Sequence, residues 1–217
     1  MDDEKILKRD LFGEIRLTAV GEEAVVVRNI SCAPWWTRWI ARRLLLREAR
    51  ALAALDGIGG VPALLQQQPD ELRRSYIAGQ PLHVARPRDA AYFAAAAGLL
   101  RRLHRAGVCH NDLAKEPNLL VRDSGTPGII DFQLAWYSRS RSRLFRIAAY
   151  EDIRHLLKHK RTYRPDLLTA REHRILANPS PASRLFRGTV KPAYLFVTRR
   201  LLGWADREGA GDRNARN

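Results

Sequence analysis

The composition of this chain of 217 residues, 46% hydrophobic and 28% charged, is ordinary for a globular protein. Its 38 lysines and arginines outnumber its 23 aspartates and glutamates, and the net charge of +15 favours a phosphate-bearing partner such as a nucleotide, a nucleic acid or an anionic membrane. Cys32 and Cys109 form no disulfide or metal-binding pattern, and the amino terminus lacks a secretory signal. We therefore expect a cytoplasmic protein, with any membrane contact peripheral, at the inner face.

The first 80 residues predict a small sheet and one long helix. Residues 6–31 alternate apolar and polar side chains around a turn at Gly21 and end in a β-branched run. Pro34 opens a helical pattern that continues to Leu55 and stops in the glycine-rich residues 56–60. Short strands are expected around residues 61–66 and 73–79.

The rest of the chain predicts helices around one short hairpin. Asp89 is a suitable cap for a helix over residues 90–107. Residues 118–135 resemble two apolar strands joined by a glycine- and proline-containing turn, and the chain beyond Trp136 is basic and mainly helical in pattern. We expect an α+β protein with an amino-terminal lobe (1–80), a mainly helical carboxy-terminal lobe (81–204) and a disordered polar tail (205–217).

Glu48 is unusual because helix geometry places its carboxylate on the apolar face. Leu45 and Leu52 lie on the same side of the helix, whereas Arg42 and Arg43 lie on the other. A buried charge is costly unless it is paired, and Arg28 at the end of the preceding strand is the natural partner. The alternative is that Glu48 lies at the edge of the apolar stripe and reaches water.

Three polar residues flank the predicted hairpin. Asn118 directly precedes its first strand, Asp131 follows its second, and Asp112 lies six residues before Asn118. Mg²⁺ prefers oxygen ligands and usually takes one or two carboxylates, so Asn118 and Asp131 suit it. A nearby carboxylate that does not bind the metal could accept the proton of an attacking hydroxyl.

These elements, in this order, resemble the catalytic elements of the protein-kinase-like superfamily. The residues that carry the resemblance are "VVVR" (25–28), "LLREARAL" (45–52), "HNDLAKEPN" (110–118) and "IIDFQ" (129–133). The H-N-D sequence, the short chain and "YIAGQPL" (76–82) resemble the lipopolysaccharide (heptose and Kdo) kinases and the RIO-like atypical kinases more than ordinary protein kinases. The resemblance implies a two-lobed kinase-like fold, binding of ATP and Mg²⁺, and phosphoryl transfer to a hydroxyl acceptor.

Residue by residue, the resemblance implies that Asp112 is the catalytic base and that Asn118 and Asp131 hold the metal. Arg28 would replace the phosphate-contacting lysine of the family and pair with Glu48, which would explain the carboxylate on the apolar face.

The resemblance also assigns supporting roles. The turn at Gly13 would cover the phosphates, and the backbone near Tyr76, Ile77 and Ala78 would receive adenine. His110 would orient the catalytic loop, and Asp152 would brace it. Lys115 would either neutralise the charge of the transferred phosphoryl group or be a solvent-exposed side chain.

Four departures from the family pattern leave two functions open. Arg28 replaces a lysine, Asn118 lies one residue further from Asp112 than usual, "DFQ" replaces D-F-G, and Gly13 stands alone instead of a glycine-rich motif. The extra residue implies that the loop bulges or that the ligand is supplied differently. The chain is therefore interpreted as an active kinase, acting on a glycolipid precursor or on protein Ser/Thr, with a non-catalytic pseudokinase scaffold as the alternative.

Other features have competing interpretations. His155 and His159 are four residues apart, but the surrounding cations favour a solvated basic face over a metal site. Aromatic and basic residues alternate in "PWWTRWIARR" (34–43) and again in residues 191–204, which suits either an anionic membrane surface or packing in the core. Nucleic-acid binding has only the net charge in its favour, because no RNA- or DNA-binding motif is present.

Overall fold

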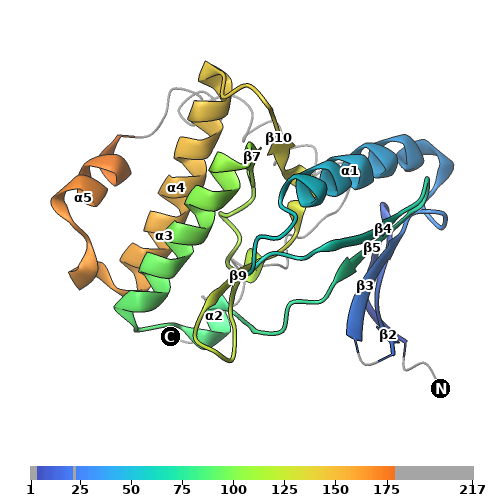
Figure 1. The fold of residues 1–217 in the computed structure, drawn as a ribbon, viewed down its shortest axis with the longest axis horizontal. Helices are drawn as coiled ribbons and strands as arrows, with labels where there is room; N and C mark the ends of the chain where they lie inside the picture. The colour runs from blue at the N-terminus through green and yellow to red at the C-terminus, as the bar shows by residue number, and fades with distance from the viewer. Residues whose placement is uncertain (1–3, 22, 179–217) are drawn as a thin grey trace, which may run out of the picture.

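The computed structural model describes residues 4–21 and 23–178. An antiparallel sheet with one long helix forms the amino-terminal part, and helices dominate the rest of the described chain (Figure 1). The predicted α+β class is confirmed. The aromatic and basic segment 191–204 and the predicted tail 205–217 lie outside the described residues, and the boundary between residues 80 and 81 stays a prediction.

Five strands make up the main sheet in the order β1-β2-β3-β5-β4, with every neighbouring pair antiparallel. Their bounds are β1 (Lys5–Asp10), β2 (Gly13–Val20), β3 (Glu23–Asn29), β4 (Leu64–Gln67) and β5 (Glu71–Ser75). The β-branched run of β3 is buried at Val25, Val26 and Val27, as a central strand requires. Arg28 is paired in register with Ile15 and with the fully buried Leu72, so its side chain lies on the core face of the sheet.

Helix α1 (Trp35–Ala54) begins after Pro34, as predicted, and packs one face on the sheet (Figure 1). Its buried side chains are Thr37, Ala41, Leu45, Glu48, Ala49, Ala51 and Leu52. The helix also touches the later part of the chain, because the Arg47 guanidinium donates to the carbonyls of Leu134 and Ala135. α1 therefore connects the sheet to the segment that carries Asp131.

Trp35, Trp36 and Trp39 are exposed on α1. The interpretation in which these aromatic side chains pack in the core is therefore wrong. The buried face of the helix is filled by its smaller apolar residues instead.

The helical part is built on α3 and α4, which pack against each other beside two small sheets (Figure 1). The Asp89 carboxylate accepts the Ala91 amide hydrogen and caps α3, as predicted. One small sheet pairs β10 with β7, and the other has the strand order β6-β8-β9. The remaining elements are β6 (Gln80–Pro81), α2 (Leu82–Ala85), α3 (Ala90–Arg105), β7 (Val108–Cys109), β8 (Leu119–Val121), β9 (Pro127–Ile129), β10 (Trp136–Tyr137), α4 (Arg143–Tyr163), α5 (Ala170–Ala177) and the short 3₁₀ turns η1 (Glu116–Asn118), η2 (Phe132–Leu134) and η3 (Pro165–Leu167).

One core joins the two parts. It contains Leu45 and Leu52 of α1, Leu72 of β5, and Leu100 and Phe132 from the helical part. None of the helices in residues 4–21 and 23–178 combines the length and the apolar character that crossing a bilayer requires.

Candidate active site

Glu48 lies at the centre of a buried charge cluster between the sheet and α1. Its Oε2 accepts a hydrogen bond of 3.1 Å from Arg28 Nη1, so the predicted ion pair is present. Its Oε1 lies 3.2 Å from Nε of Arg74 on β5, close enough for an ion pair but not aligned as a hydrogen bond. Glu48 is fully buried, which excludes the alternative in which it reaches water. The cluster holds two guanidinium groups against one carboxylate.

Asp152 and His110 fix the start of the loop that follows β7. The Asp152 carboxylate on α4 accepts the amide hydrogens of His110 and Asn111 at 2.7 and 2.9 Å, and it lies 3.2 Å from His104 Nε2. The His110 ring reaches the Ile130 carbonyl at 2.9 Å and accepts the Asp112 amide hydrogen at 3.3 Å. Both side chains therefore contact the backbone around Asp112, where the sequence places them.

Asp112 and Asn118 meet directly, even though one extra residue separates them. Asn118 Nδ2 donates to the backbone carbonyl of Asp112 at 2.9 Å and to its Oδ2 at 3.2 Å. The 3₁₀ turn η1 lies within this stretch, and bulging of the loop stays a prediction. Lys115 Nζ lies 3.0 Å from the same Asp112 oxygen, which gives this half-exposed lysine a defined partner.

The hairpin of β8 and β9 brings the backbone next to Asp131 to Asn118. β8 and β9 pair antiparallel, and the Ile130 amide donates to the Asn118 carbonyl at 3.0 Å. Asp131 takes a left-handed conformation with φ of 66°, and its Oδ1 is buried without a hydrogen-bond partner among the described residues. A buried, unpartnered carboxylate oxygen suits Mg²⁺, and the Ile130 contact brings the backbone just before Asp131 to Asn118. The residues present therefore fit the metal that the sequence motifs imply.

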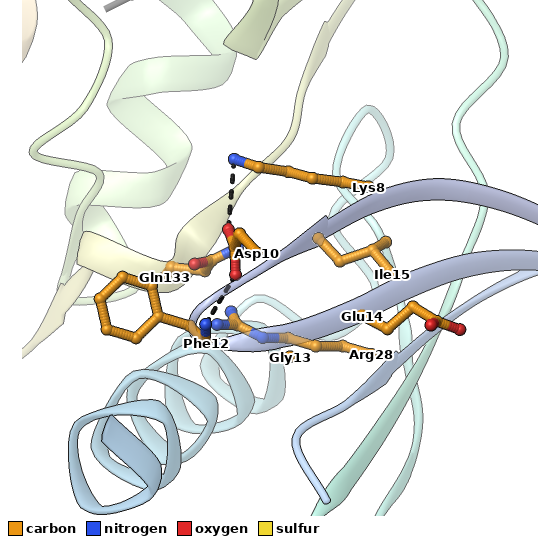
Figure 2. A pocket seen from close by; sticks show the side chains of 8 residues that line it. All are labelled: Lys8, Asp10, Phe12, Gly13, Glu14, Ile15, Arg28 and Gln133. Atoms are coloured by element: carbon orange, nitrogen blue, oxygen red, sulfur yellow. Dashed lines mark hydrogen bonds and ion pairs between the residues drawn. The ribbon is translucent and has the colours of Figure 1, made fainter. Parts of the chain in front are cut away.

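A small pocket lies between the turn of β1 and β2 and the segment after Asp131. Figure 2 shows the Arg28 side chain directed toward the Phe12–Gly13 turn, with Gln133 beside it and Lys8 reaching Asp10. Its volume is about 20 Å3, room for roughly one water molecule. The DFQ variation thus places a side chain at the wall of this pocket, where D-F-G would have none.

Gly13 has a packing reason for being glycine. Its φ is 121°, and a Cβ there would lie 2.3 Å from the Asn29 carbonyl oxygen. The turn therefore packs against the end of β3 and close to Arg28.

The predicted adenine segment links β5 to β6 and contributes none of the residues that line this pocket. The Tyr76 amide donates to the Ala24 carbonyl at 3.0 Å, so its donor is already used. Its carbonyl is still an acceptor, and the adenine role of Tyr76, Ile77 and Ala78 stays a prediction.

The loop from His110 to Asn118 has a second support that sequence reasoning missed. The Tyr163 hydroxyl donates to Glu116 Oε2 at 2.6 Å, and His159 contacts the Leu113 carbonyl at 2.7 Å. Glu116 opens the turn that ends at Asn118, so α4 holds the loop at both ends. The prediction of a solvated face around His155 and His159 is wrong, because His159 is buried and burial lowers the pKa of His155 to about 4. Tyr163 belongs to none of the sequence motifs, so nothing in the sequence indicated this contact.

One group of possible metal ligands outside this site has a structural explanation. His104, Cys109 and Asp152 place their ligand atoms within 4.8 Å of one another. However, burial raises the pKa of the Cys109 thiol far above its usual range, with the charge of Asp152 adding to the shift. The thiol lies 3.6 Å from the Phe145 carbonyl, so the group supports the loop.

Comparison with known proteins shows which proteins the chain and its fold resemble. No family model matches the chain. Among curated proteins, it is 35% identical over 119 residues to the DNA damage-responsive serine/threonine-protein kinase RqkA of Deinococcus radiodurans, a match that covers 48% of this chain and 18% of the relative. The chain thus spans less than a fifth of that protein.

Solved structures of the Rio2 kinase from Chaetomium thermophilum resemble the fold. One is a complex with ADP/Mg²⁺ and phosphoaspartate and gives a TM-score of 0.56 at 17% identity. The match covers 82% of this chain and 59% of the Rio2 chain. Another gives a TM-score of 0.59 at 18% identity and covers 82% and 60%. The predicted resemblance to RIO-like kinases is confirmed for the fold, and that to lipopolysaccharide kinases stays a prediction.

Proposed function

Because the chain has a protein-kinase-like fold with RIO-like kinases among its structural relatives, we propose that it is an ATP- and Mg²⁺-dependent phosphotransferase. The observation that carries the proposal is the contact of Asn118 with Asp112, together with the buried, unpartnered oxygen of Asp131, which follows Ile130 where its amide bonds to the Asn118 carbonyl. Phosphoryl transfer needs one group to take a proton and others to position charge, and these residues offer both.

In the proposed reaction, an acceptor hydroxyl oxygen bonds to the γ-phosphorus of ATP while the bond from that phosphorus to the β–γ bridging oxygen breaks. The hydroxyl proton passes to Asp112 and ADP leaves. Lys115 and Asn118 both contact Oδ2 of Asp112, so its Oδ1 is the candidate proton acceptor. Lys115 also brings a positive charge to the position where the phosphoryl group would be transferred.

Asn118 and Asp131 would hold Mg²⁺, which neutralises phosphate charge when it is bound. Arg28 would contact the phosphates from the sheet, with Glu48 fixing its guanidinium. The turn at Gly13 would cover the phosphates, and the backbone near Ile77 and Ala78 would receive adenine.

The acceptor carries a hydroxyl group. A protein Ser/Thr acceptor is supported by the serine/threonine-protein kinase among the relatives. A glycolipid acceptor is supported by the exposed aromatic residues of α1.

The second candidate is a pseudokinase scaffold that binds a nucleotide or a partner without turnover. The size of the pocket beside Arg28 and Gln133 favours it, because triphosphate binding would require the sheet and the helical part to separate there.

A thermal-shift experiment with ATP, with and without Mg²⁺, tests the proposal. Saturation at about a hundred times the dissociation constant stabilises a fold by about 2.7 kcal/mol, a shift of several degrees. We expect a Mg²⁺-dependent shift that Asp131→Ala removes and that Asp123→Ala, an exposed carboxylate in the turn of the same hairpin, retains. Asp112→Ala should bind nucleotide without transferring phosphate. No shift in the parent chain would favour the scaffold.

A further inference from the structure

One face of α1 exposes large aromatic side chains to solvent. Trp35, Trp36 and Trp39 are 84%, 49% and 61% exposed, and Leu46 is 40% exposed. At 100° per residue, these four side chains and Arg43 lie within an arc of about 100°. We call these five residues the tryptophan face.

The fold does not require this face to be apolar. The opposite side of α1 is already filled, with Ala41, Leu45 and Leu52 at 0–1% exposure against the sheet and core. Single exposed apolar residues are common, but three tryptophans within two helical turns form a contiguous patch, which usually marks an interaction site.

The charges around the tryptophan face select an anionic partner. Arg38, Arg42 and Arg43 lie on the same helix, and its one acidic residue, Glu48, is buried in the cluster with Arg28. Arg42 is paired with Asp70, whereas the other two add positive charge next to the indole rings. A second copy of this chain would bring like charge, and so would its own segment 191–204, which contains three basic and no acidic residues.

We propose that the tryptophan face docks on an anionic lipid bilayer. Tryptophan is favoured at the headgroup level, where its ring is in apolar surroundings and its N–H remains hydrated. Arginine beside it meets lipid phosphates, and each such contact adds to the attraction. A helix that lies on the surface satisfies both kinds of side chain at once.

The turn of β1 and β2, which lines the pocket next to Arg28, contacts the buried side of α1 and not the tryptophan face. The Thr37 hydroxyl of α1 donates to the Leu11 carbonyl at 2.6 Å, but Thr37 is buried and lies about 150° around the helix from the middle of the tryptophan face. Leu11 is exposed, and the next two residues, Phe12 and Gly13, line the pocket next to Arg28. The docking proposal therefore stands on the tryptophan face alone and does not rest on the proposed kinase function.

Flotation of the full chain with vesicles tests the proposal. Vesicles of mixed phosphatidylglycerol and phosphatidylcholine are compared with vesicles of phosphatidylcholine alone. We expect binding to the anionic vesicles, and a loss of about tenfold or more in affinity for the double variant Trp35→Ser/Trp39→Ser. Leu144→Ser removes a comparably exposed apolar side chain (68%) from α4 and is the matched control, with unchanged binding expected.

The double variant leaves the net charge of +15 unchanged, which separates docking from general electrostatic attraction. Equal binding by parent and variant would overturn the proposal, because charge or another segment would then be responsible. Absence of vesicle binding would also overturn it and would direct attention to an acidic protein partner. Asp131→Ala should bind vesicles normally, so failure of the kinase proposal would be recognised separately. Thermal melting confirms that each variant is folded.

Discussion

Replacing Glu48 by glutamine tests the buried charge cluster, because it removes the single negative charge without changing the side chain's size. Arg28 and Arg74 are both buried, and each has an oxygen of Glu48 within 3.2 Å. Two guanidinium groups would then face each other with only a neutral amide between them. We expect Glu48→Gln to lower the free energy of unfolding more than the loss of either arginine does.

The magnitude follows from the cost of leaving a buried charge unpaired. Removing one partner of a buried pair costs about 3–5 kcal/mol, and here two cations lose the same partner. Arg74→Met should cost about 1 kcal/mol or less, because the hydrogen-bonded Arg28–Glu48 pair is retained with balanced charge. Arg28→Met should fall between them at about 2 kcal/mol, because Arg74 approaches Glu48 without hydrogen-bond alignment.

Thermal and urea unfolding of the three variants measure these differences. For a chain of this size, about 4 kcal/mol corresponds to a decrease in Tm of roughly 8–16 °C. The predicted order is Glu48→Gln, then Arg28→Met, then Arg74→Met, from least to most stable. If the free energy of unfolding of Glu48→Gln lies within about 1 kcal/mol of that of the parent chain, the cluster is solvated and the reasoning from burial is wrong.

Two further predictions concern α4. Tyr163→Phe removes the hydroxyl bonded to Glu116, so we expect the free energy of unfolding to fall by about 1–2 kcal/mol and the Mg²⁺-dependent thermal shift with ATP to become smaller. An equal decrease of that thermal shift in Tyr150→Phe would argue against a role of Tyr163 in positioning the loop. His155 has its pKa lowered to about 4, mainly by burial and then by Lys158. As the pH falls, His155 is therefore protonated in the unfolded chain before it is protonated in the folded chain. Stability should be full above about pH 6.5 and decline toward pH 4 by at most about 3 kcal/mol, and His155→Gln should flatten this decline in a pH series of melts.

The parts of the fold that sequence predicted well are those set by local chemistry. The β-branched run before Arg28, the Asp89 cap and the carboxylate on the apolar face of α1 each depend on neighbours within a few residues. A buried Glu48 also requires a cation, and Arg28 was the one on a buried strand. The pairing could therefore be deduced before any coordinates were known.

The parts that sequence missed depend on contacts between distant segments. Arg74 lies in a strand whose pattern gives no sign that its side chain faces Glu48, because register decides the face of every strand residue. Tyr163 reaches Glu116 across 47 residues of chain. The exposure of Trp35 and Trp39 depends on which face of α1 the sheet covers, and the aromatic composition fitted either outcome.

The replacement of the family's lysine by Arg28 is understandable in this setting. A planar guanidinium has five donors, and Arg28 uses Nη1 toward Glu48 while its side chain extends toward the Gly13 turn. With Arg74 on the other carboxylate oxygen, the cluster has a surplus of one positive charge that Glu48 does not balance. A buried surplus cation is stabilised by an anion, and nucleotide phosphates at the pocket would supply it. In the proposed function, the second arginine would therefore make the pocket beside Arg28 more favourable for a phosphate, even though it contributes little to the stability of the empty fold.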